Sequence, residues 1–184
     1  MADFDSLTDE ELVEHVRSKD QEVYAKLVKR YEARLLRYAR SFVHDDHAAQ
    51  DVVQNAFIKA FINLKGFNTK KRFSSWIYRI VHNESLNEIK KYKKEFSLDN
   101  MQESSLPIND NDMEEAFDIQ LSQEKIAACI DKLPLTYRSP IILHFLEDKS
   151  YEEISDILRM PMGTVGTCIN RGKKLLNQLC NNHG

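Results

Sequence analysis

The sequence predicts an all-α protein of two small helical domains joined by an acidic flexible linker, with a helix-turn-helix in the second domain. Apolar residues recur at intervals of three and four along most of the chain, which is the spacing of one helix face. Only five glycines and four prolines occur in 184 residues, so few positions favour turns. Residues 95–122 lose the periodicity and are rich in Asp, Asn, Ser and Glu, as linkers are. We therefore expect one domain over residues 1–94 and another over residues 123–184.

Three helices are expected before residue 65. Thr8 and Glu11 are spaced as a capping box, which opens a short acidic helix that ends near Lys19. Asp20 is expected to cap the second helix, whose apolar stripe is Tyr24, Leu27, Val28, Tyr31, Leu35, Tyr38 and Phe42. The third helix runs to about Leu64 and should turn these side chains inward: Ala49, Val52, Val53, Ala56, Phe57, Ala60 and Phe61.

A turn and a fourth helix complete the first domain. Residues 66–69, Gly-Phe-Asn-Thr, have the composition of a turn. Ser74 or Ser75 is expected to cap a helix from Trp76 to about Lys94. Because Trp76 has apolar neighbours on this helix, we expect its ring to lie in the core.

The second domain is expected to end in a helix-turn-helix. A helix from about residue 122 to 132 stops at Leu133-Pro134, and another follows to about Leu146. Ser150 and Glu153 form a further capping box, and Pro161 suits the first turn of the last helix. That helix has an apolar stripe at Val165, Ile169, Gly172, Leu176 and Leu179, and an outer face with Thr164, Thr167, Asn170, Arg171 and Lys174. A short helix bracing such a face is the layout that places side chains in a DNA major groove, although an ordinary helical hairpin is the alternative.

The net charge of −3 conceals a strong alternation along the chain. Residues 23–94 carry sixteen basic and six acidic side chains, whereas residues 95–124 carry nine acidic and no basic ones. A basic block can be a solvated surface, but an adjoining tract of opposite sign favours a polyanion partner.

The cysteines and the N-terminus indicate a cytoplasmic protein. Cys129, Cys168 and Cys180 have no disulfide or metal-ligand spacing, and Cys129 and Cys180 lie among apolar helical residues, where free cysteine behaves as a small hydrophobe. We see no signal peptide at the N-terminus and no apolar run long enough to insert in a membrane. No cofactor or metal is expected, because His44 and His47 with the two aspartates between them are explained by a polar loop.

Several stretches occur in an order that one family shares. In the first half they are Tyr31-Glu-Ala-Arg-Leu-Leu-Arg-Tyr-Ala39, Asp51-Val-Val-Gln-Asn-Ala-Phe57, and Phe73-Ser-Ser-Trp-Ile-Tyr-Arg-Ile80 with Asn83. In the second half they are Leu133-Pro134 with Arg138, Tyr151-Glu-Glu-Ile154, and Pro161-Met-Gly-Thr-Val165 with Arg171. Together they resemble domains 2 and 4 of an extracytoplasmic-function (group four) sigma factor of the sigma-70 family.

The resemblance implies a bacterial initiation factor that binds core RNA polymerase, at the β′ clamp coiled coil and the β subunit, and directs it to promoter DNA. The residues implied to bind the clamp are Asp51, Gln54 and Asn55. Those implied to read and open the minus-ten element are Phe67, Asn68, Lys70, Lys71, Arg72, Arg79, Asn83, Asn87, Lys90 and Lys91. They combine cations with an aromatic surface, as binding of unstacked strands requires.

The last helix is implied to bind the minus-thirty-five element through Thr164, Thr167, Asn170, Arg171, Lys173 and Lys174. This sequence departs from the family there, because Gly166 and Cys168 stand where Lys, Ser or Arg are usual and Arg159 replaces the customary turn glycine. The resemblance also suggests a possible anti-sigma factor. The acidic linker could be a plain tether, but the resemblance and the absence of Lys and Arg favour a segment that threads the polymerase cleft.

Two other classes of function compete with this interpretation. An enzyme is disfavoured, because no phosphate-cradling glycine loop and no catalytic set of residues is spaced along the chain. A stand-alone helix-turn-helix regulator would explain residues 130–180, but it leaves the polar face at Asp51 and the basic loop at residues 67–73 without a role.

Overall fold

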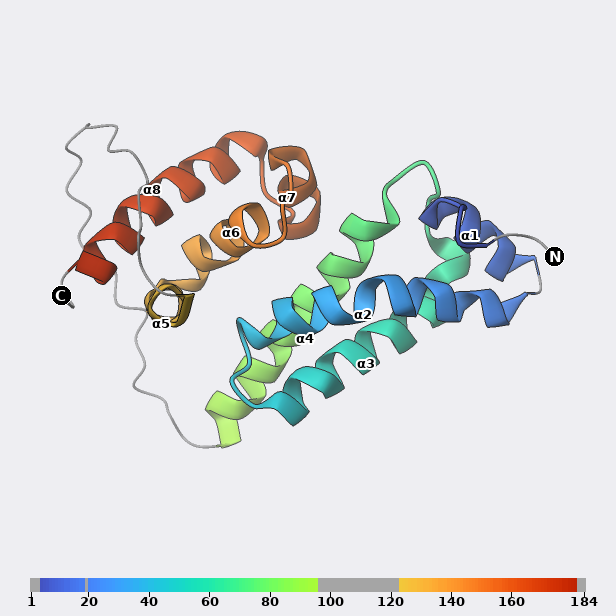
Figure 1. Ribbon diagram of the computed structural model, residues 1–184, viewed down its shortest axis with the longest axis horizontal. Coiled ribbons are helices and arrows are strands. Elements are labelled where there is room, and N and C mark those ends of the chain that lie inside the picture. Colours follow the sequence, from blue (N-terminus) through green and yellow to red (C-terminus); the bar gives the residue numbers. More distant parts are fainter. Residues whose placement is uncertain (1–3, 19, 96–122, 182–184) are drawn as a thin grey trace. The chain divides into compact units, whose positions relative to one another are not determined.

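The computed structural model describes residues 4–18, 20–95 and 123–181 (Figure 1). Within these ranges all regular structure is helical, as the sequence predicts. The chain divides into two compact units, one built on α1 to α4 and the other on α5 to α8. The predicted linker lies outside the described residues, except for residue 95.

The first unit begins with α1 (Asp9–Arg17), and its capping box is confirmed. The Thr8 hydroxyl accepts a hydrogen bond from the Glu11 N–H at 3.2 Å, and the Glu11 carboxylate accepts one from the Thr8 N–H at 2.8 Å. The prediction that Asp20 caps the second helix is wrong, because its side chain makes no capping hydrogen bond. A short 3₁₀ turn, η1 (Gln21–Val23), comes first and leads directly into α2 (Tyr24–Arg40).

Helices α2, α3 (Asp46–Asn63) and α4 (Phe73–Glu95) pack around one core (Figure 1). Tyr38 of α2 is fully buried, and its ring packs edge-on against Tyr78 of α4 at 5.4 Å between centroids. Asp45 caps α3 by accepting the Ala48 N–H at 2.7 Å. The polar segment before α3 therefore has a structural role, and among the described residues no cluster of His, Cys, Asp and Glu could hold a metal ion.

The second unit consists of α5 (Gln123–Asp131), α6 (Leu135–Phe145), α7 (Tyr151–Leu158) and α8 (Met162–Asn181). The predicted capping box of Ser150 and Glu153 opens α7. Gly172 allows α6 and α8 to approach closely, because a Cβ there would lie 2.8 Å from Cγ1 of Ile141. A larger side chain at this crossing would force the helices apart.

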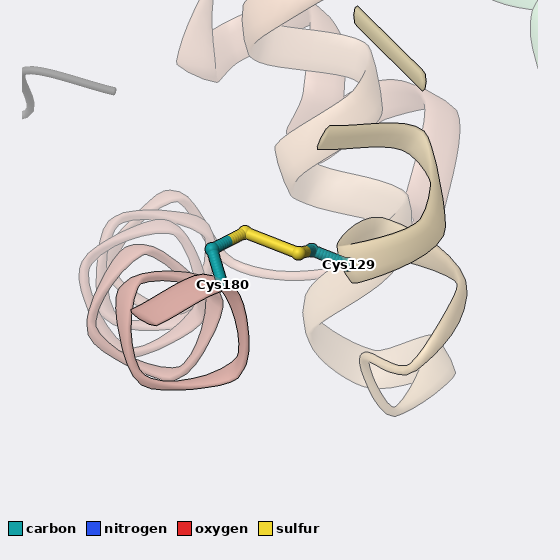
Figure 2. Close-up of a disulfide and its surroundings, with 2 residues drawn as sticks. All are labelled: Cys129 and Cys180. Atoms are coloured by element: carbon teal, nitrogen blue, oxygen red, sulfur yellow. A yellow bond between two sulfur atoms is a disulfide. The ribbon is translucent and has the colours of Figure 1, made fainter. Parts of the chain in front are cut away.

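Cys129 of α5 and Cys180 of α8 form a disulfide (Figure 2), with their Cα atoms 5.7 Å apart. This corrects the expectation of two free thiols. The two residues are 51 positions apart in sequence, so only the packing of α5 against α8 brings them together. Cys168 remains the free cysteine, and burial raises the pKa of its thiol.

None of the described helices has the length and apolar character that a bilayer crossing requires.

Candidate functional site

Helix α3 carries an exposed stripe that is polar at one end and apolar at the other. Asp51, Gln54 and Asn55 are exposed, as the sequence predicts. The same face continues at the helical spacing of three and four residues through Ile58, Phe61 and Ile62, whose exposed fractions are 51%, 39% and 70%. We call these six residues the α3 stripe.

The apolar half of the α3 stripe was missed or misplaced by the sequence reasoning. Phe61 was expected in the core, but it lies at the edge of the core. Its ring packs against that of Tyr24, with 5.0 Å between the ring centroids, and 39% of the residue is exposed. Ile58 and Ile62 were not singled out. Their helical spacing from Asp51 could have indicated their exposure, because it places them on the same face of the helix as the polar residues.

Residues 64–73 connect α3 to α4, beginning with the 3₁₀ turn η2 (Leu64–Gly66) and ending on the first residue of α4; we call them the minus-ten loop, after the promoter element that the resemblance implies they read. The Asn68 side-chain oxygen accepts the Lys70 N–H at 3.0 Å, and the Asn68 carbonyl accepts the Lys71 N–H at 2.9 Å. Asn68 therefore shapes the turn that carries the exposed cations Lys70, Lys71 and Arg72. These four residues of the predicted minus-ten surface therefore lie close together on the outside of the unit.

Phe67 differs from its neighbours because its ring is only 7% exposed. It packs against Trp76 at 4.8 Å and Phe73 at 5.9 Å between ring centroids. Phe67 was predicted to contact DNA, but in this structure it holds the loop on α4 and does not present its ring to solvent.

A surface hollow of about 440 Å³ lies between α3 and α4. Its walls are Lys59, Asn63, Gly66, Trp76, Ile80, Asn83 and Glu84. Lys59 and Glu84 form an ion pair of 2.6 Å at its edge. Trp76 is half-buried, so the expectation that it belongs to the core holds only in part: its ring packs against Phe67 and Phe73, and it also lines the hollow.

The exposed face of α4 extends from this hollow along the helix. Asn83 lines the hollow, and Asn87, Lys90 and Lys91 follow it at helical spacing, all exposed. Arg79 precedes Asn83 by one turn, but its side chain is only 13% exposed. The predicted minus-ten residues other than Phe67 and Arg79 thus form an exposed surface over the loop and α4.

Beneath this surface, α4 is fixed to α2 by a buried polar contact. The Tyr38 hydroxyl lies 3.0 Å from Nδ1 of His82. Burial lowers the pKa of His82 to about 4, so its ring is neutral at physiological pH. The contact is therefore a neutral hydrogen bond inside the core.

The helix-turn-helix presents the predicted outer face of α8. Thr164, Thr167, Asn170 and Arg171 are exposed, while Cys168 faces the interior of the unit. The turn before this helix is made by Arg159, which adopts a left-handed conformation with φ of 57° where glycine would be unstrained. Arg159 therefore occupies the position of the customary turn glycine in a strained backbone conformation.

Lys173 lies apart from the other predicted contacts on α8. Its ammonium group lies over the Phe145 ring of α6, 5.8 Å from the centroid. Lys174 is partly exposed on the same side as Thr167 and Arg171. The basic residues in the middle of α8 thus point in two directions.

Comparison with known proteins places both units in one family. The model of Sigma-70 region 2 matches residues 27–95, and the model of Sigma-70, region 4, matches residues 123–176. The chain is 32% identical to the ECF RNA polymerase sigma factor SigW of Bacillus subtilis (strain 168) over 174 residues, which are 90% of this chain and 93% of that protein. It is 30% identical to the ECF RNA polymerase sigma-E factor of Escherichia coli (strain K12), with 94% of each chain covered.

The fold agrees with solved structures of similar proteins. CnrH, in a complex with the cytosolic domain of CnrY, superposes with a TM-score of 0.73 at 23% identity, covering 96% of this chain and 99% of CnrH. The sigma factor RpoE, in a complex with the anti-sigma factor NepR from Bartonella quintana, superposes with a TM-score of 0.67 over 86% and 96% of the two chains.

These matches define the class of protein: the chain belongs to the sigma-70 family and, within it, to the ECF RNA polymerase sigma factors. It is a sigma factor that directs transcription initiation. Sigma factors as a family act by binding and are not enzymes.

Proposed function

We propose that the α3 stripe is the surface on which core RNA polymerase docks. The stripe combines three polar residues with three exposed apolar ones on a helix whose opposite face is already buried. Exposed apolar patches mark interaction surfaces. The observation that carries the proposal is the continuity of Ile58 and Ile62 with Asp51, Gln54 and Asn55. The family resemblance implies the β′ clamp coiled coil as the partner.

We assign the minus-ten loop and the hollow beside it to promoter opening. Unstacked bases need an aromatic or apolar wall, and Trp76 and Ile80 supply one. The amide side chains of Asn63 and Asn83, which line the same hollow, can hydrogen-bond to base edges. The cations of the loop, Lys70, Lys71 and Arg72, are placed to follow the phosphate backbone. The volume of about 440 Å³ is sufficient for one base.

The outer face of α8 is the corresponding surface for the minus-thirty-five element. Thr164, Thr167 and Asn170 are the candidates for contacts with base edges, because they are exposed toward the start and middle of the helix. Arg171 and Lys174 suit the phosphates. Lys173 is the weakest member of this set, since its ammonium group lies over Phe145.

The protein is proposed to act in the cytoplasm, where polymerase and chromosome meet; this rests on the family, because the disulfide between Cys129 and Cys180 removes the argument from free cysteines. An anti-sigma factor is a further candidate partner, because RpoE of Bartonella quintana was solved with the anti-sigma factor NepR.

The docking assignment is tested by the double variant Asp51→Ala with Gln54→Ala. Both side chains are exposed, so helicity and thermal stability should not change. Affinity for core polymerase should fall by ~2 kcal/mol or more, because interfaces concentrate their energy in a few residues. Wild-type affinity in this variant would refute the assignment of the polar half of the stripe.

The minus-ten assignment is tested by replacing Lys70, Lys71 and Arg72 with Ala. Open-complex formation should slow and become less dependent on salt, since each phosphate contact releases about one counterion. Trp76→Ala should reduce permanganate reactivity of the opened strand, because it removes a wall of the hollow. Normal opening kinetics in both variants would contradict the proposal.

A further inference from the structure

Helix α1 holds the beginning of the minus-ten loop through the side chain of Arg17. The Arg17 Nε and Nη2 atoms donate hydrogen bonds to the Leu64 carbonyl at 3.0 and 2.7 Å. Nη2 also donates to the Phe67 carbonyl. Because α3 ends at Asn63, both acceptors belong to the segment that leaves the helix. One guanidinium group thus fixes two carbonyls of the loop, with the planar donor geometry that lysine lacks.

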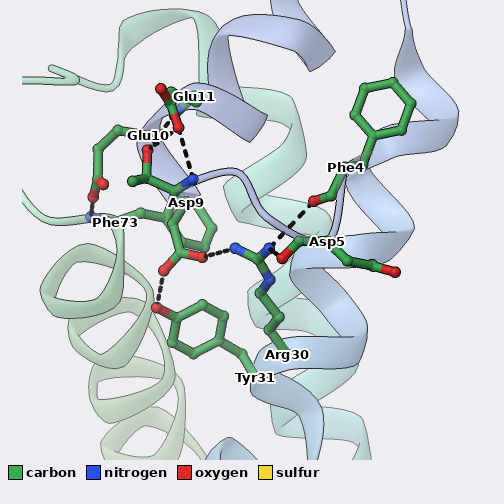
Figure 3. Close-up of polar contacts among 9 residues, drawn as sticks. Phe4, Asp5, Asp9, Glu10, Glu11, Arg30, Tyr31 and Phe73 are labelled. Atoms are coloured by element: carbon green, nitrogen blue, oxygen red, sulfur yellow. Dashed lines mark hydrogen bonds and ion pairs between the residues drawn. The ribbon is translucent and has the colours of Figure 1, made fainter. Parts of the chain in front are cut away.

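The same helix holds the other end of the loop through Glu10. The Glu10 Oε1 atom accepts the N–H of Phe73 at 2.7 Å (Figure 3). Phe73 is the first residue of α4, so this N–H has no partner within the helix. The expectation that Ser74 or Ser75 caps a helix starting at Trp76 is wrong, because α4 already begins at Phe73 and both serines lie inside its first turn. The Glu10 carboxylate at the start of α4 is also favoured by the helix dipole.

Helix α1 is a firm support for these contacts. Leu12 and Val13 are fully buried against the rest of the unit. On the other side of the helix start, Asp9 forms an ion pair of 2.8 Å with Arg30 and accepts a hydrogen bond from the Tyr31 hydroxyl (Figure 3). The helix is thus tied to α2 while it reaches both ends of the loop.

We propose that α1 positions the minus-ten loop, with Arg17 and Glu10 as positioning residues that set the rate and base preference of promoter opening without touching DNA. The inference rests on the proposed role of the loop in promoter opening. It adds a role for a helix that lies before the matched Sigma-70 region 2 segment, which starts at residue 27.

The physical reason is preorganisation of a short, highly charged segment. The loop presents Lys70, Lys71 and Arg72 in succession, and their mutual repulsion favours an extended, variable conformation. A loop that must be ordered during binding loses affinity through the entropy of ordering. Fixing the carbonyls at its start and the N–H at its end removes part of that cost before DNA arrives.

The test uses the full chain assembled with core RNA polymerase on a promoter fragment. Arg17→Ala removes the donors, Glu10→Ala removes the acceptor, and Glu10→Gln keeps an acceptor at the same place. The exposed ion pair between Asp5 and Lys26, 2.7 Å long, supplies controls. Asp5→Ala matches the charge change of Glu10→Ala, and Lys26→Ala matches that of Arg17→Ala. Three quantities are measured: affinity for core, rate of opening by permanganate reactivity, and amide hydrogen exchange of residues 64–73 in the free chain.

Arg17→Ala and Glu10→Ala should each slow opening about tenfold and accelerate amide exchange in the loop, because each loses a charge-assisted hydrogen bond. Core affinity should stay within about twofold of wild type, since neither residue belongs to the α3 stripe. Glu10→Gln should restore most of the opening rate. Opening rates equal to those of the control variants, or a Glu10→Gln rate as low as that of Glu10→Ala, would overturn the inference.

Three further outcomes keep the test decisive. If Arg17→Ala does not fold, the comparison of Glu10→Ala with Glu10→Gln decides alone. If the triple variant of Lys70, Lys71 and Arg72 opens promoters normally, the proposed role of the loop fails. If that triple variant is slow while the α1 variants match their controls, only the positioning role of α1 fails.

Discussion

The apolar half of the α3 stripe allows a quantitative prediction about polymerase binding. In the double variant Ile58→Ser with Ile62→Ser, two exposed apolar side chains become small and polar. Full burial of an isoleucine contributes about 1.5–3 kcal/mol. Ile58 is 51% exposed and Ile62 is 70% exposed. Burying these exposed parts against the polymerase would contribute roughly 1 kcal/mol of binding free energy for Ile58 and 1.5 kcal/mol for Ile62. Their sum is about 2.5 kcal/mol, which is a loss of affinity of roughly 30- to 100-fold.

The measurement is a titration of the labelled chain with core polymerase. Thermal melting of the free variant should be nearly unchanged, because the replaced side chains lie outside the core. Tyr92→Ser is the matched control, because Tyr92 is 54% exposed on α4 and lies outside the α3 stripe. Unchanged affinity in the double variant would refute the reasoning. A melting temperature lowered as strongly as the affinity would refute it too, since the residues would then be stabilising the fold.

Three other predictions concern the stability of the two units. The pKa of His82 is about 4 in the folded chain, below its value of ~6.5 when unfolded, so the unfolded state takes up the proton first. The folding stability that depends on the neutral ring is fully present above pH ~6.5 and falls by ~3 kcal/mol as the pH falls toward 4. In His82→Gln, which keeps an acceptor for the Tyr38 hydroxyl, urea unfolding should lose this part of the pH dependence of stability. An unchanged slope of stability against pH would contradict the prediction. Gly172→Ala should destabilise the second unit by ~1–3 kcal/mol, because the new Cβ meets Ile141, and calorimetry showing a gain would disprove the close crossing. Reducing the disulfide between α5 and α8 should lower the stability of the second unit by up to ~4 kcal/mol for a closed loop of this length, so equal melting with and without reductant would mean that the bond contributes nothing.

The helices were predictable because their signals are local. The capping boxes at Thr8 and Ser150 and the apolar stripes follow from residues three and four positions apart; the structure contains both boxes, and on α3 every predicted inward residue except Phe61 is buried. The end of α7 was harder, since Arg159 stands in a left-handed turn that usually carries glycine.

The errors arose where distant segments meet. No pattern near residue 73 in the sequence predicts that Glu10 caps α4, because the two partners are 63 residues apart. The pairing of Cys129 with Cys180 was hidden for the same reason. Trp76 had apolar neighbours on its own helix, and only the position of the loop shows that one side of its ring faces a hollow.

The predicted roles of the polar residues on α3, the loop and α8 came from the family resemblance. The structure adds where those side chains lie: Asn68 within the turn, Phe67 beneath it, and Lys173 over Phe145. Whether the acidic linker threads the polymerase cleft or only tethers the domains is a prediction about residues outside the described ranges. Replacing its acidic residues with Ser or Asn at constant length separates the two accounts.

The most direct test of the central claim is promoter binding with and without core polymerase. A duplex promoter fragment, chosen by mapping the DNA that polymerase occupies in the presence of this chain, is mixed with the chain alone, core alone, or both. The account predicts a specific complex and permanganate-reactive thymines at the minus-ten element only when both proteins are present. Specific binding of the duplex by the chain alone, unchanged by core and without strand opening, would contradict it and identify a stand-alone helix-turn-helix regulator.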